Sequence, residues 1–309
     1  TKRWNPSAAW YFTAYGFALR AVARWRQQGL IFAGASPGML RLPRHAEEEA
    51  QLQAIGSTLA LDPAIVHWLS RDEASATAGL ELRSGAAFFP QGSWISPPQL
   101  CQALLDHPLI MLREHTAVER LTRAGEAWQL TLASGEVIST PICCVAAATE
   151  SLELLADYGI RLGQVGGQVS EFHDRDVAAP LRSILCHKGY LIPYGERYLT
   201  GATYHREALT DVTAARHQEN AAELAAMLPG WLQGSMVAGR SAVRATTPDR
   251  LPYIGRVDAG LYVSTGHGSR GMLSAPLAAE IIASSLAGEA SPVSAPLAQA
   301  VAPGRFRKG

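Results

Sequence analysis

The segment from Gly266 to Gly271 has the spacing of a turn that binds an electron-rich group. Its residues, Gly-His-Gly-Ser-Arg-Gly, are a literal GxGxxG; they follow the apolar run from Leu261 to Thr265 and precede a run typical of a helix. Such a turn places no side chains in the way, and the first N–H groups of the helix are free to donate to a phosphate, a carboxylate or a carbonyl oxygen. The sequence therefore predicts an anion- or carbonyl-binding turn at this point.

Two other interpretations of the same turn remain open. A self-sufficient dinucleotide site needs a second strand that ends in an acidic residue about 20 positions later, within one βαβ unit. The acidic candidate, Glu289, lies in a tail rich in Ser, Pro and Ala, with no strand predicted before it, which disfavours this interpretation. In the other interpretation, the glycines only allow the strand and the helix to pack closely.

Arg244 is the second candidate, because its two neighbours in a predicted strand are apolar. A guanidinium in such a strand needs an anionic partner or an opening to solvent. Arg244 is therefore either the anchor for a substrate carboxylate or the partner of Asp249 at the end of the strand. His205 and His267 are candidates for assisting the loss of a proton, although a lone histidine beside a turn is more often structural.

Helical and β-rich segments alternate along the chain and would position these groups. The first helix begins at Asn5, whose side chain can cap it ahead of Pro6. The pattern predicts further helices at 45–61, 63–70, 96–105, 151–156 and 214–227 and after residue 271. It predicts strands within 30–42 and 85–95, and at 109–115, 117–123, 127–133, 136–141, 142–148, 166–173, 184–194, 197–205, 237–244 and 261–265.

These elements indicate a mixed α/β (α+β) fold with two interleaved domains, because segments with helix-and-strand character lie on both sides of a β-rich insertion. A domain of the cofactor-binding type is predicted to combine segments 1–28, 95–158 and 249–309. An antiparallel β-rich substrate domain is predicted to combine segments 29–94 and 159–248.

Composition excludes several classes of protein. Hydrophobic residues make up 48% and charged residues 17%, so the chain is not intrinsically disordered. Lys plus Arg equals Asp plus Glu at 27 each, which argues against a strongly basic nucleic-acid binder but leaves a local basic patch open. The four cysteines form no CxxC pair, which disfavours a zinc or disulfide framework. With neither a membrane-spanning apolar run nor a signal peptide pattern, we expect no membrane partner and a cytoplasmic location.

Several segments together resemble, in the same order, the D-amino-acid/glycine oxidase superfamily. They are FPQGSWISPPQL (89–100), GGQVS (166–170), GYLIP (189–193), GATYHR (201–206), VRATTPDRLPYIG (243–255) and GHGSRGMLSAPLAAEII (266–282). Within it, the sequence is most similar to the FAD-dependent C-terminal modules of bifunctional bacterial enzymes that make 5-methylaminomethyl-2-thiouridine at the tRNA wobble position. The PQGxW, YHR and SRGxxSAPLAAE segments are fairly specific to these modules, whereas VRxxTxD is shared more widely.

The resemblance implies an oxidoreductase that acts on a CH–NH bond with FAD. It would remove the carboxymethyl group from 5-carboxymethylaminomethyl-(2-thio)uridine in tRNA, releasing glyoxylate and leaving 5-aminomethyl-(2-thio)uridine. FAD is expected to be non-covalent, because Ala242 stands where some sarcosine-oxidising relatives have a cysteine. Two alternatives are a flavoenzyme that oxidises a small glycine, sarcosine or D-amino acid, and an inactive fragment of the family that cannot hold flavin.

The resemblance also assigns roles to individual residues. Arg244 would pair with the substrate carboxylate, and Tyr190, Tyr204 and Arg206 would line the substrate side. The residues assigned to the cofactor are Val118, Ala147, Gly266, Gly268, Ser269, Arg270, Gly271 and Met272.

The sequence departs from the family pattern in three places. The family's adenosine-diphosphate grip, a GxGxxG βαβ unit, precedes the helix at Asn5, so we expect a Rossmann-like FAD-binding domain that is N-terminally incomplete here. The methyltransferase domain of the bifunctional relatives is also not in the sequence, so methylation is not expected of this chain. Relatives usually end the strand at 146–148 with a glycine close to the cofactor, where this chain has alanines.

Overall fold

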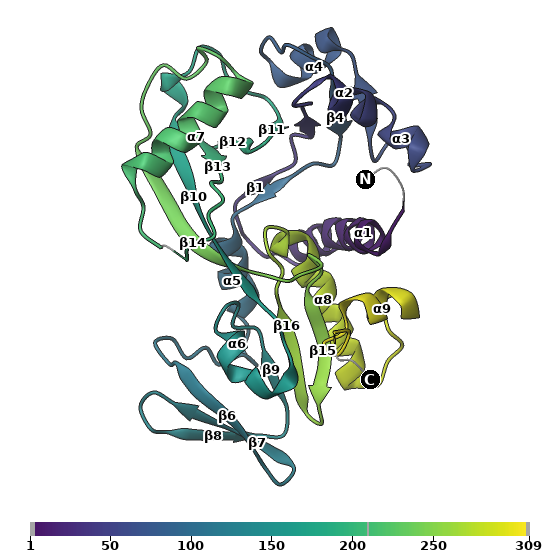
Figure 1. The fold of residues 1–309 in the computed structure, drawn as a ribbon, viewed down its shortest axis with the longest axis vertical. Coiled ribbons are helices and arrows are strands. Elements are labelled where there is room, and N and C mark those ends of the chain that lie inside the picture. Colours follow the sequence, from purple (N-terminus) through teal and green to yellow (C-terminus); the bar gives the residue numbers. More distant parts are fainter. Residues whose placement is uncertain (1–3, 209, 307–309) are drawn as a thin grey trace. The chain divides into compact units, whose positions relative to one another are not determined.

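The computed structural model describes residues 4–208 and 210–306, which form two compact units (Figure 1). Unit 1 contains Trp4, Phe32–Ser96 and Gly166–Val243. Unit 2 contains Asn5–Ile31, Pro97–Val165 and the described chain from Arg244 onwards. The mixed α/β class with interleaved segments is confirmed. The assignment of the cofactor to one set of segments and the substrate to the other stays a prediction.

Within the described residues, the framework of unit 1 is an eight-stranded sheet in the order β14-β10-β13-β12-β11-β2-β4-β3. Strand β11 runs parallel to β2 and antiparallel to β12, and β10, β12 and β13 form antiparallel pairs. The bounds are β2 (Met39–Arg41), β3 (His67–Leu69), β4 (Ala86–Phe89), β10 (Gly163–His173), β11 (Ile184–Cys186), β12 (Tyr190–Tyr194), β13 (Arg197–Gly201) and β14 (Ala238–Thr246). The short strands β1 (Gly34–Ala35) and β5 (Trp94–Ile95) pair separately.

Helices cover the sheet of unit 1 and complete its core. They are α2 (Ala46–Gln53), α3 (Ile55–Thr58), α4 (Arg71–Ala78) and α7 (Ala214–Met227), with a 3-10 turn at Asp174–Asp176. Leu224 of α7 packs against buried sheet residues that include Phe172 and Leu191, so α7 is fixed to the sheet by apolar contact. Thr213 caps α7, because its side chain accepts a hydrogen bond from the N–H of Arg216.

Unit 2 contains two three-stranded sheets among its described residues. The first joins β9 (Cys143–Val145), β16 (Leu261–Thr265) and β15 (Tyr253–Asp258), and β16 runs parallel to β9 and antiparallel to β15. The second is the meander of β6 (Val118–Ala124), β7 (Ala127–Leu132) and β8 (Val137–Thr140). The pairing of β16 with β9 therefore brings together strands that are more than a hundred residues apart in sequence.

The long helices of unit 2 are α1 (Pro6–Gln27) and α8 (Gly271–Ala287), which pack on one another through a buried cluster that includes Trp10, Ala14 and Leu277. As predicted, α1 begins with a cap from Asn5, whose Oδ1 lies 2.8 Å from the amide of Ala8. The shorter helices are α5 (Pro97–Leu105), α6 (Ser151–Leu154) with the 3-10 turn Ala156–Tyr158, and α9 (Ala295–Val301). No described helix is both long enough and apolar enough to cross a membrane.

The predicted helix at 63–70 is wrong. Residues 67–69 form β3, which pairs with β4, and the helix follows as α4. A short apolar run does not distinguish a buried strand from a helix. Here residues 67–69 form a strand because they pair with β4 at the edge of the sheet. The predicted helix at 45–61 is divided into α2 and α3, and the strand β15 and the helix α9 were not anticipated from the sequence.

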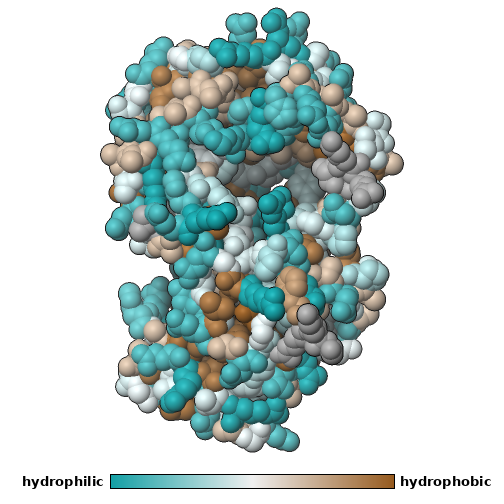
Figure 2. Space-filling model, viewed as in Figure 1, coloured by the Kyte–Doolittle hydropathy of each residue, from teal (hydrophilic) through white to brown (hydrophobic). Residues whose placement is uncertain are grey.

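The predicted strand at 109–115 is also wrong. The segment forms no β-ladder with described residues, and its apolar side chains are exposed, with Leu109 at 89% and Met111 at 87%. The strand expected at 142–148 is shortened to β9, and Ile142 and Cys144 are exposed rather than buried. Figure 2 shows hydrophobic residues at the surface of unit 2 in the region of α6 and β9. Strand formation depends on a neighbouring strand, which an apolar pattern alone does not guarantee.

Candidate functional site

The glycine turn joins the end of β16 to the start of α8. Gly266 and Gly268 have φ values of +75° and +57°, the left-handed region that favours glycine. A Cβ at Gly266 would lie 2.5 Å from Cγ2 of Thr247, so this position also has no room for a side chain. No strand follows α8 within the described residues, since α9 comes next, and the turn is therefore not the fingerprint of a complete βαβ dinucleotide site.

The first turn of α8 has amide groups without acceptors. Its N-cap residue, Arg270, makes no side-chain capping bond, and the amides of Leu273 and Ser274 donate to the carbonyl of Arg270 at 3.1 Å. Among the described residues, no acceptor is found for the amides of Gly271 and Met272. Because α8 is 17 residues long, these amides stand at the positive end of a full helix dipole. The turn therefore offers two directed donors to an electron-rich atom.

Arg244 lies on β14, close in the chain to the residues that hold this turn. The amide of Gly268 donates to the carbonyl of Ala245 at 2.9 Å, so the turn is tied to the residue that follows Arg244. Nη1 of Arg244 is buried and has no hydrogen-bond partner among the described residues. A buried N–H without an acceptor is costly, and a charged one more so, which points to an anionic ligand at this position.

The alternative partner for Arg244 is excluded, because Asp249 binds a different arginine. Arg305 donates to both carboxylate oxygens of Asp249, at 2.8 and 3.0 Å, and the amide of Leu251 adds a third bond at 3.1 Å. Burial acts to raise the pKa of Asp249, but the hydrogen bonds from Arg305 and Leu251 hold the pKa below its usual value. The alternative in which Arg244 pairs with Asp249 is therefore wrong, and Asp249 instead forms a structural pair with Arg305.

Two further residues assigned to the cofactor, Ala147 and Val118, lie in unit 2, and only Ala147 is close to the turn. Ala147 follows β9 and is partly buried, and the next carbonyl, that of Ala148, accepts a bond from Thr265 Oγ1 at 2.9 Å. This bond brings the end of β9 to the end of β16, immediately before the turn. Val118 instead opens β6, where it pairs with Leu132 in the other sheet of unit 2.

The exposed side chains of the turn have varied surroundings. Ser269 and Met272 point to the surface, whereas the guanidinium of Arg270 lies 4.5 Å from the centre of the Tyr11 ring. The Tyr11 hydroxyl donates to the carbonyl of Arg250 at 2.7 Å, so Arg270 rests on a ring that is itself held in place. This cation–π contact links the turn to α1.

His267 is a structural group of the turn. Its Nδ1 lies 2.7 Å from Ser274 Oγ in α8, and its Nε2 lies 3.1 Å from Ser264 Oγ in β16. Burial lowers the pKa of His267 to about 4, so the ring is neutral at physiological pH. With both nitrogens engaged, His267 joins strand to helix, and the structure favours this role over that of a proton acceptor for substrate.

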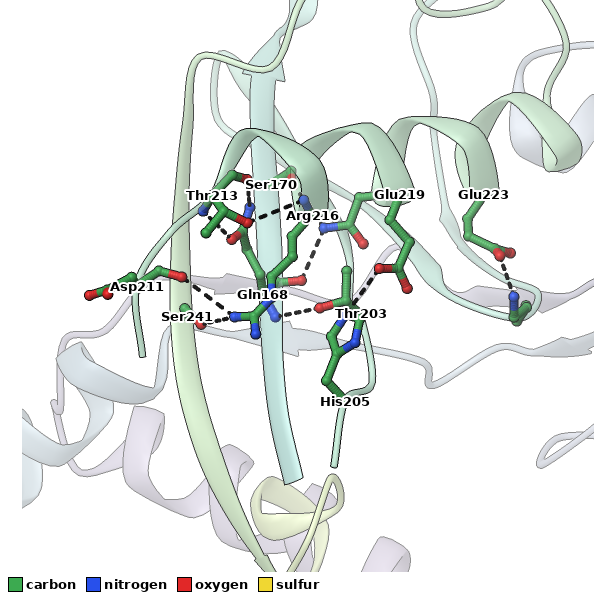
Figure 3. A network of polar contacts seen from close by, with 12 residues as sticks. Gln168, Ser170, Thr203, His205, Asp211, Thr213, Arg216, Glu219, Glu223 and Ser241 are labelled. Carbon is green, nitrogen blue, oxygen red and sulfur yellow. Dashed lines mark hydrogen bonds and ion pairs between the residues drawn. The ribbon is translucent and has the colours of Figure 1, made fainter. Parts of the chain in front are cut away.

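The residues predicted for the substrate side, Tyr190, Tyr204 and Arg206, belong to unit 1. Tyr190 and Tyr204 line a pocket of about 370 Å³ beside β12, β13 and α7. His205 lies between Tyr204 and Arg206, and its Nε2 is 3.0 Å from Glu219 Oε2 on α7 (Figure 3). The pocket is also lined by Lys188 and Glu223, which form an ion pair, and by Glu219. Tyr204 is 65% exposed and Arg206 is exposed.

Residues 2–285 match the family model of the FAD dependent oxidoreductases. The chain belongs to this family of FAD-dependent oxidoreductases. The resemblance inferred from the sequence is thereby confirmed at the level of the family, its enzyme class and its cofactor.

Curated relatives and solved structures agree with this assignment. The chain is 33% identical to the tRNA 5-methylaminomethyl-2-thiouridine biosynthesis bifunctional protein MnmC of Pseudomonas entomophila, over 87% of the chain and 46% of the relative. It is 33% identical to the protein of the same name from Chromobacterium violaceum, over 98% of the chain and 51% of the relative. The chain therefore spans about half the length of these relatives.

The solved structures share the fold. Glycine oxidase from Geobacillus kaustophilus superposes with a TM-score of 0.82 at 23% identity, covering 95% of this chain and 83% of that chain. Iminodiacetate oxidase from Chelativorans sp. BNC1 gives a TM-score of 0.82 at 22% identity, covering 98% and 86%.

The residues of unit 2 fit the ring end of the family's cofactor. A flavin ring has electron-rich carbonyl groups, and the acceptor-free amides of Gly271 and Met272 are suited to such an atom. The side-chain-free surface at Gly266 and Gly268 allows close approach to the backbone. The residues at the uncapped start of α8 therefore fit this end of the cofactor.

Two features of this oxidoreductase have no clear signal in its sequence. One is the bidentate pair of Arg305 with Asp249, two residues that are far apart in the chain. The other is a buried polar network in unit 1 centred on Gln168, which is wholly buried. The only signal for Gln168 was its place in the GGQVS segment, and that signal assigned it no role.

Proposed function

We propose that this oxidoreductase removes the carboxymethyl group from 5-carboxymethylaminomethyl-(2-thio)uridine at the wobble position of tRNA, giving 5-aminomethyl-(2-thio)uridine. The observation that carries the proposal is the buried Nη1 of Arg244, which has no partner among the described residues. Arg244 directly precedes Ala245, whose carbonyl holds the glycine turn. The relatives named for biosynthesis of 5-methylaminomethyl-2-thiouridine support the choice of substrate.

Arg244 binds the carboxylate of the reacting group. In this group a single methylene separates the carboxylate from the amine nitrogen, so fixing the carboxylate also fixes the carbon that is oxidised. A guanidinium matches a carboxylate with two parallel N–H···O bonds, which a lysine cannot reproduce. The bound carboxylate would supply the acceptor that Nη1 of Arg244 lacks.

The amides of Gly271 and Met272 would hold an electron-rich carbonyl of the flavin ring, and the positive end of α8 would stabilise negative charge there. When bound, FAD would supply the oxidising power, as the acceptor of a hydride from the methylene carbon of the carboxymethyl group. Hydrolysis of the resulting C=N bond would release glyoxylate and leave the primary amine. His267 stays neutral and holds β16 to α8.

The substrate amine must lose its proton before oxidation, because the nitrogen lone pair assists departure of the hydride. The two nitrogens of His267 are occupied by Ser264 and Ser274, and His205 is engaged with Glu219. We therefore assign no side chain as a general base, and the amine loses its proton to solvent. The product is a primary amine. Methylation of that amine, as expected of a bifunctional relative, is not proposed for this chain.

The direct test is to incubate the purified chain, supplied with FAD, with tRNA that carries 5-carboxymethylaminomethyluridine. Nucleoside mass spectrometry should show conversion to 5-aminomethyluridine, with one glyoxylate released for each nucleoside converted. Glycine and sarcosine serve as small-molecule controls. Oxidation of these amino acids without conversion of the tRNA would replace this proposal with a small-molecule oxidase.

Attachment of the cofactor is tested separately. Ala242 has no nucleophile, so we expect FAD to be held non-covalently. Acid precipitation of the FAD-loaded chain should leave the yellow colour in the supernatant. Colour that remains in the washed pellet would contradict this expectation.

A further inference from the structure

The segment that carries Tyr204 is paired with β10 on both sides of that residue. The amide of Thr203 donates to the carbonyl of Gln168 at 3.0 Å, and the amide of Gln168 donates to Thr203 Oγ1 at 2.9 Å. His205 exchanges two backbone bonds with Gly166, at 2.9 and 3.0 Å. The backbone of Tyr204 is therefore fixed at the residue before it and at the residue after it.

This pairing sets the direction of the tyrosine side chain. Successive side chains of an extended chain point to opposite sides. Thr203 is 3% exposed and points into the protein, whereas Tyr204 is 65% exposed. The Tyr204 ring is thus an exposed aromatic surface on an anchored backbone, rather than a side chain on a free loop.

Gln168 holds the far end of the same segment through its side chain (Figure 3). Its Nε2 donates to the carbonyl of Thr213 at 3.1 Å, and its Oε1 accepts from the amide of Thr213 at 2.8 Å. Thr213 is also the cap of α7. One buried residue therefore joins the beginning of the segment, at Thr203, to its end, at Thr213.

A residue of α7, Asn220, also belongs to the network around Gln168. Asn220 is 2% exposed, and its Nδ2 donates to the carbonyl of Gln168 at 3.0 Å and to Ser170 Oγ at 2.9 Å. Buried polar groups that are fully hydrogen-bonded make a local structure rigid. An aromatic side chain on a fixed backbone has only two side-chain torsions left to order, so it gives up little conformational entropy when it binds a partner.

A ring presented in this way suits an unpaired nucleobase. The substrate proposed above carries its reacting nucleoside in the single-stranded anticodon loop, and proteins recognise such loops by stacking splayed bases on aromatic side chains. Arg206, two residues further along the chain, is exposed and adds a positive charge to the same segment, which suits a phosphate backbone. Building on the proposed function, we propose that Gln168 is a positioning residue that holds Tyr204 as a stacking platform for an unpaired base of the RNA substrate.

The positioning step is tested by hydrogen exchange, which needs neither FAD nor RNA. Gln168→Leu removes the two side-chain bonds to Thr213, and peptides that cover 203–213 should exchange about tenfold faster than in the wild type. Ser170→Ala is the matched control, because it removes a buried hydroxyl of the same network without touching Thr203 or Thr213. If Gln168→Leu folds poorly, Thr203→Val tests the bond at the other end. Unchanged exchange over 203–213 in both variants would overturn the inference.

The stacking step is tested by binding of an anticodon stem–loop RNA to the full chain at fixed salt. Tyr204→Ala should weaken binding about fivefold to a hundredfold, whereas Tyr204→Phe should keep most of the affinity. Gln168→Leu should weaken binding in the wild-type background and have no additional effect in the Tyr204→Ala background, because it acts through the ring.

The outcomes separate this inference from the proposed function. RNA binding that is unaffected by Tyr204→Ala would overturn the stacking platform and leave the proposed substrate standing. A loss from Gln168→Leu that persists in the Tyr204→Ala background would overturn the positioning role. A wild-type chain that binds no RNA would overturn the proposed tRNA substrate and the stacking platform together, while the exchange experiment would still report on Gln168 as a clamp.

Discussion

The network around Gln168 in unit 1 and the glycine turn of unit 2 differ in whether their polar groups have hydrogen-bond partners. Gln168 uses both ends of its side-chain amide on Thr213. In unit 2, Nη1 of Arg244 and the first amides of α8 have no acceptors among the described residues. Buried polar groups in proteins are nearly always satisfied, so the difference is informative. The side chains around Gln168 are positioned by hydrogen bonds within the chain, whereas Arg244 and the start of α8 have donors that remain available to a ligand.

The largest effect on turnover should come from replacing Arg244, whose Nη1 has no hydrogen-bond partner among the described residues. Arg244→Leu should lower kcat/KM for the tRNA by about a hundredfold or more, because the substrate carboxylate loses a charge-assisted partner. Arg244→Lys should lose several-fold to a hundredfold, because an ammonium cannot make the two parallel bonds. Neither variant should lower the stability of the FAD-free protein, because no hydrogen bond of Nη1 is lost. Arg244→Leu also removes a buried donor that has no acceptor, so it should leave the stability unchanged or raise it. The measurements are steady-state turnover and urea unfolding. A large loss of stability with unchanged turnover would show that Arg244 has a structural role within the chain, like Gln168, rather than a role in substrate binding.

In the network around Gln168, a substitution should instead lower the stability of the FAD-free protein. Gln168→Leu removes the acceptor of the Thr213 amide, whereas the Thr213 carbonyl keeps its bond from the amide of His217 at 3.1 Å. The variant should lower the free energy of unfolding by about 1–3 kcal/mol. Arg244→Leu is the matched control, since it also replaces a long polar side chain by leucine. Urea unfolding of the two variants, measured side by side, checks the contrast. Equal losses in both variants would break the comparison between the two regions.

The sequence predicted those parts of the fold that have strong local signals. Asn5 and Pro6 mark the start of α1, and the strand, turn and helix around Gly266 follow from the glycines and the apolar pattern. The errors concern elements whose form depends on distant neighbours. Residues 67–69 became a strand because β4 lies beside them, and residues 109–115 found no such neighbour among the described residues.

The candidate site was predictable to a similar degree. Arg244 and the turn were visible because an arginine in an apolar strand and a GxGxxG spacing are unusual on their own. The partner of Asp249 was not, because Arg305 follows it by 56 positions and only the folded chain brings them together. Gln168 carried no local signal either, since a single glutamine in a strand has many possible surroundings.

The turn itself contains both kinds of polar group, because His267 is fully hydrogen-bonded whereas the amides of Gly271 and Met272 have no acceptors among the described residues. His267 is satisfied at both nitrogens, and burial lowers its pKa to about 4, below the unfolded value of about 6.5. The unfolded state therefore binds more protons between these values, so this contribution is present above pH 6.5 and is lost as the pH falls towards 4. Between pH 7 and pH 5 the loss should be about 2 kcal/mol. Urea unfolding of the wild type and His267→Gln at the two pH values measures it. An identical pH dependence in both proteins would contradict the buried neutral ring.

The smallest effect concerns the backbone that leads to the turn. Ala148 has a φ of +48°, in the left-handed region that favours glycine, and Thr265 Oγ1 holds its carbonyl at 2.9 Å. This conformation costs a non-glycine residue about 1–2 kcal/mol, whereas glycine costs about 0.4–1 kcal/mol in unfolded-chain entropy. Ala148→Gly should therefore stabilise the protein by about 0.5 kcal/mol. Ala146→Gly, at an exposed residue of the same segment outside the left-handed region, should instead destabilise it by about 0.5–1 kcal/mol. Urea unfolding of the two variants and the wild type decides, because equal destabilisation by both would show that the strain at Ala148 carries no energetic weight. Stabilisation by Ala148→Gly alone would show that the backbone of Ala148 is strained. This strain would lie directly beside the glycine turn, because Thr265 holds the Ala148 carbonyl.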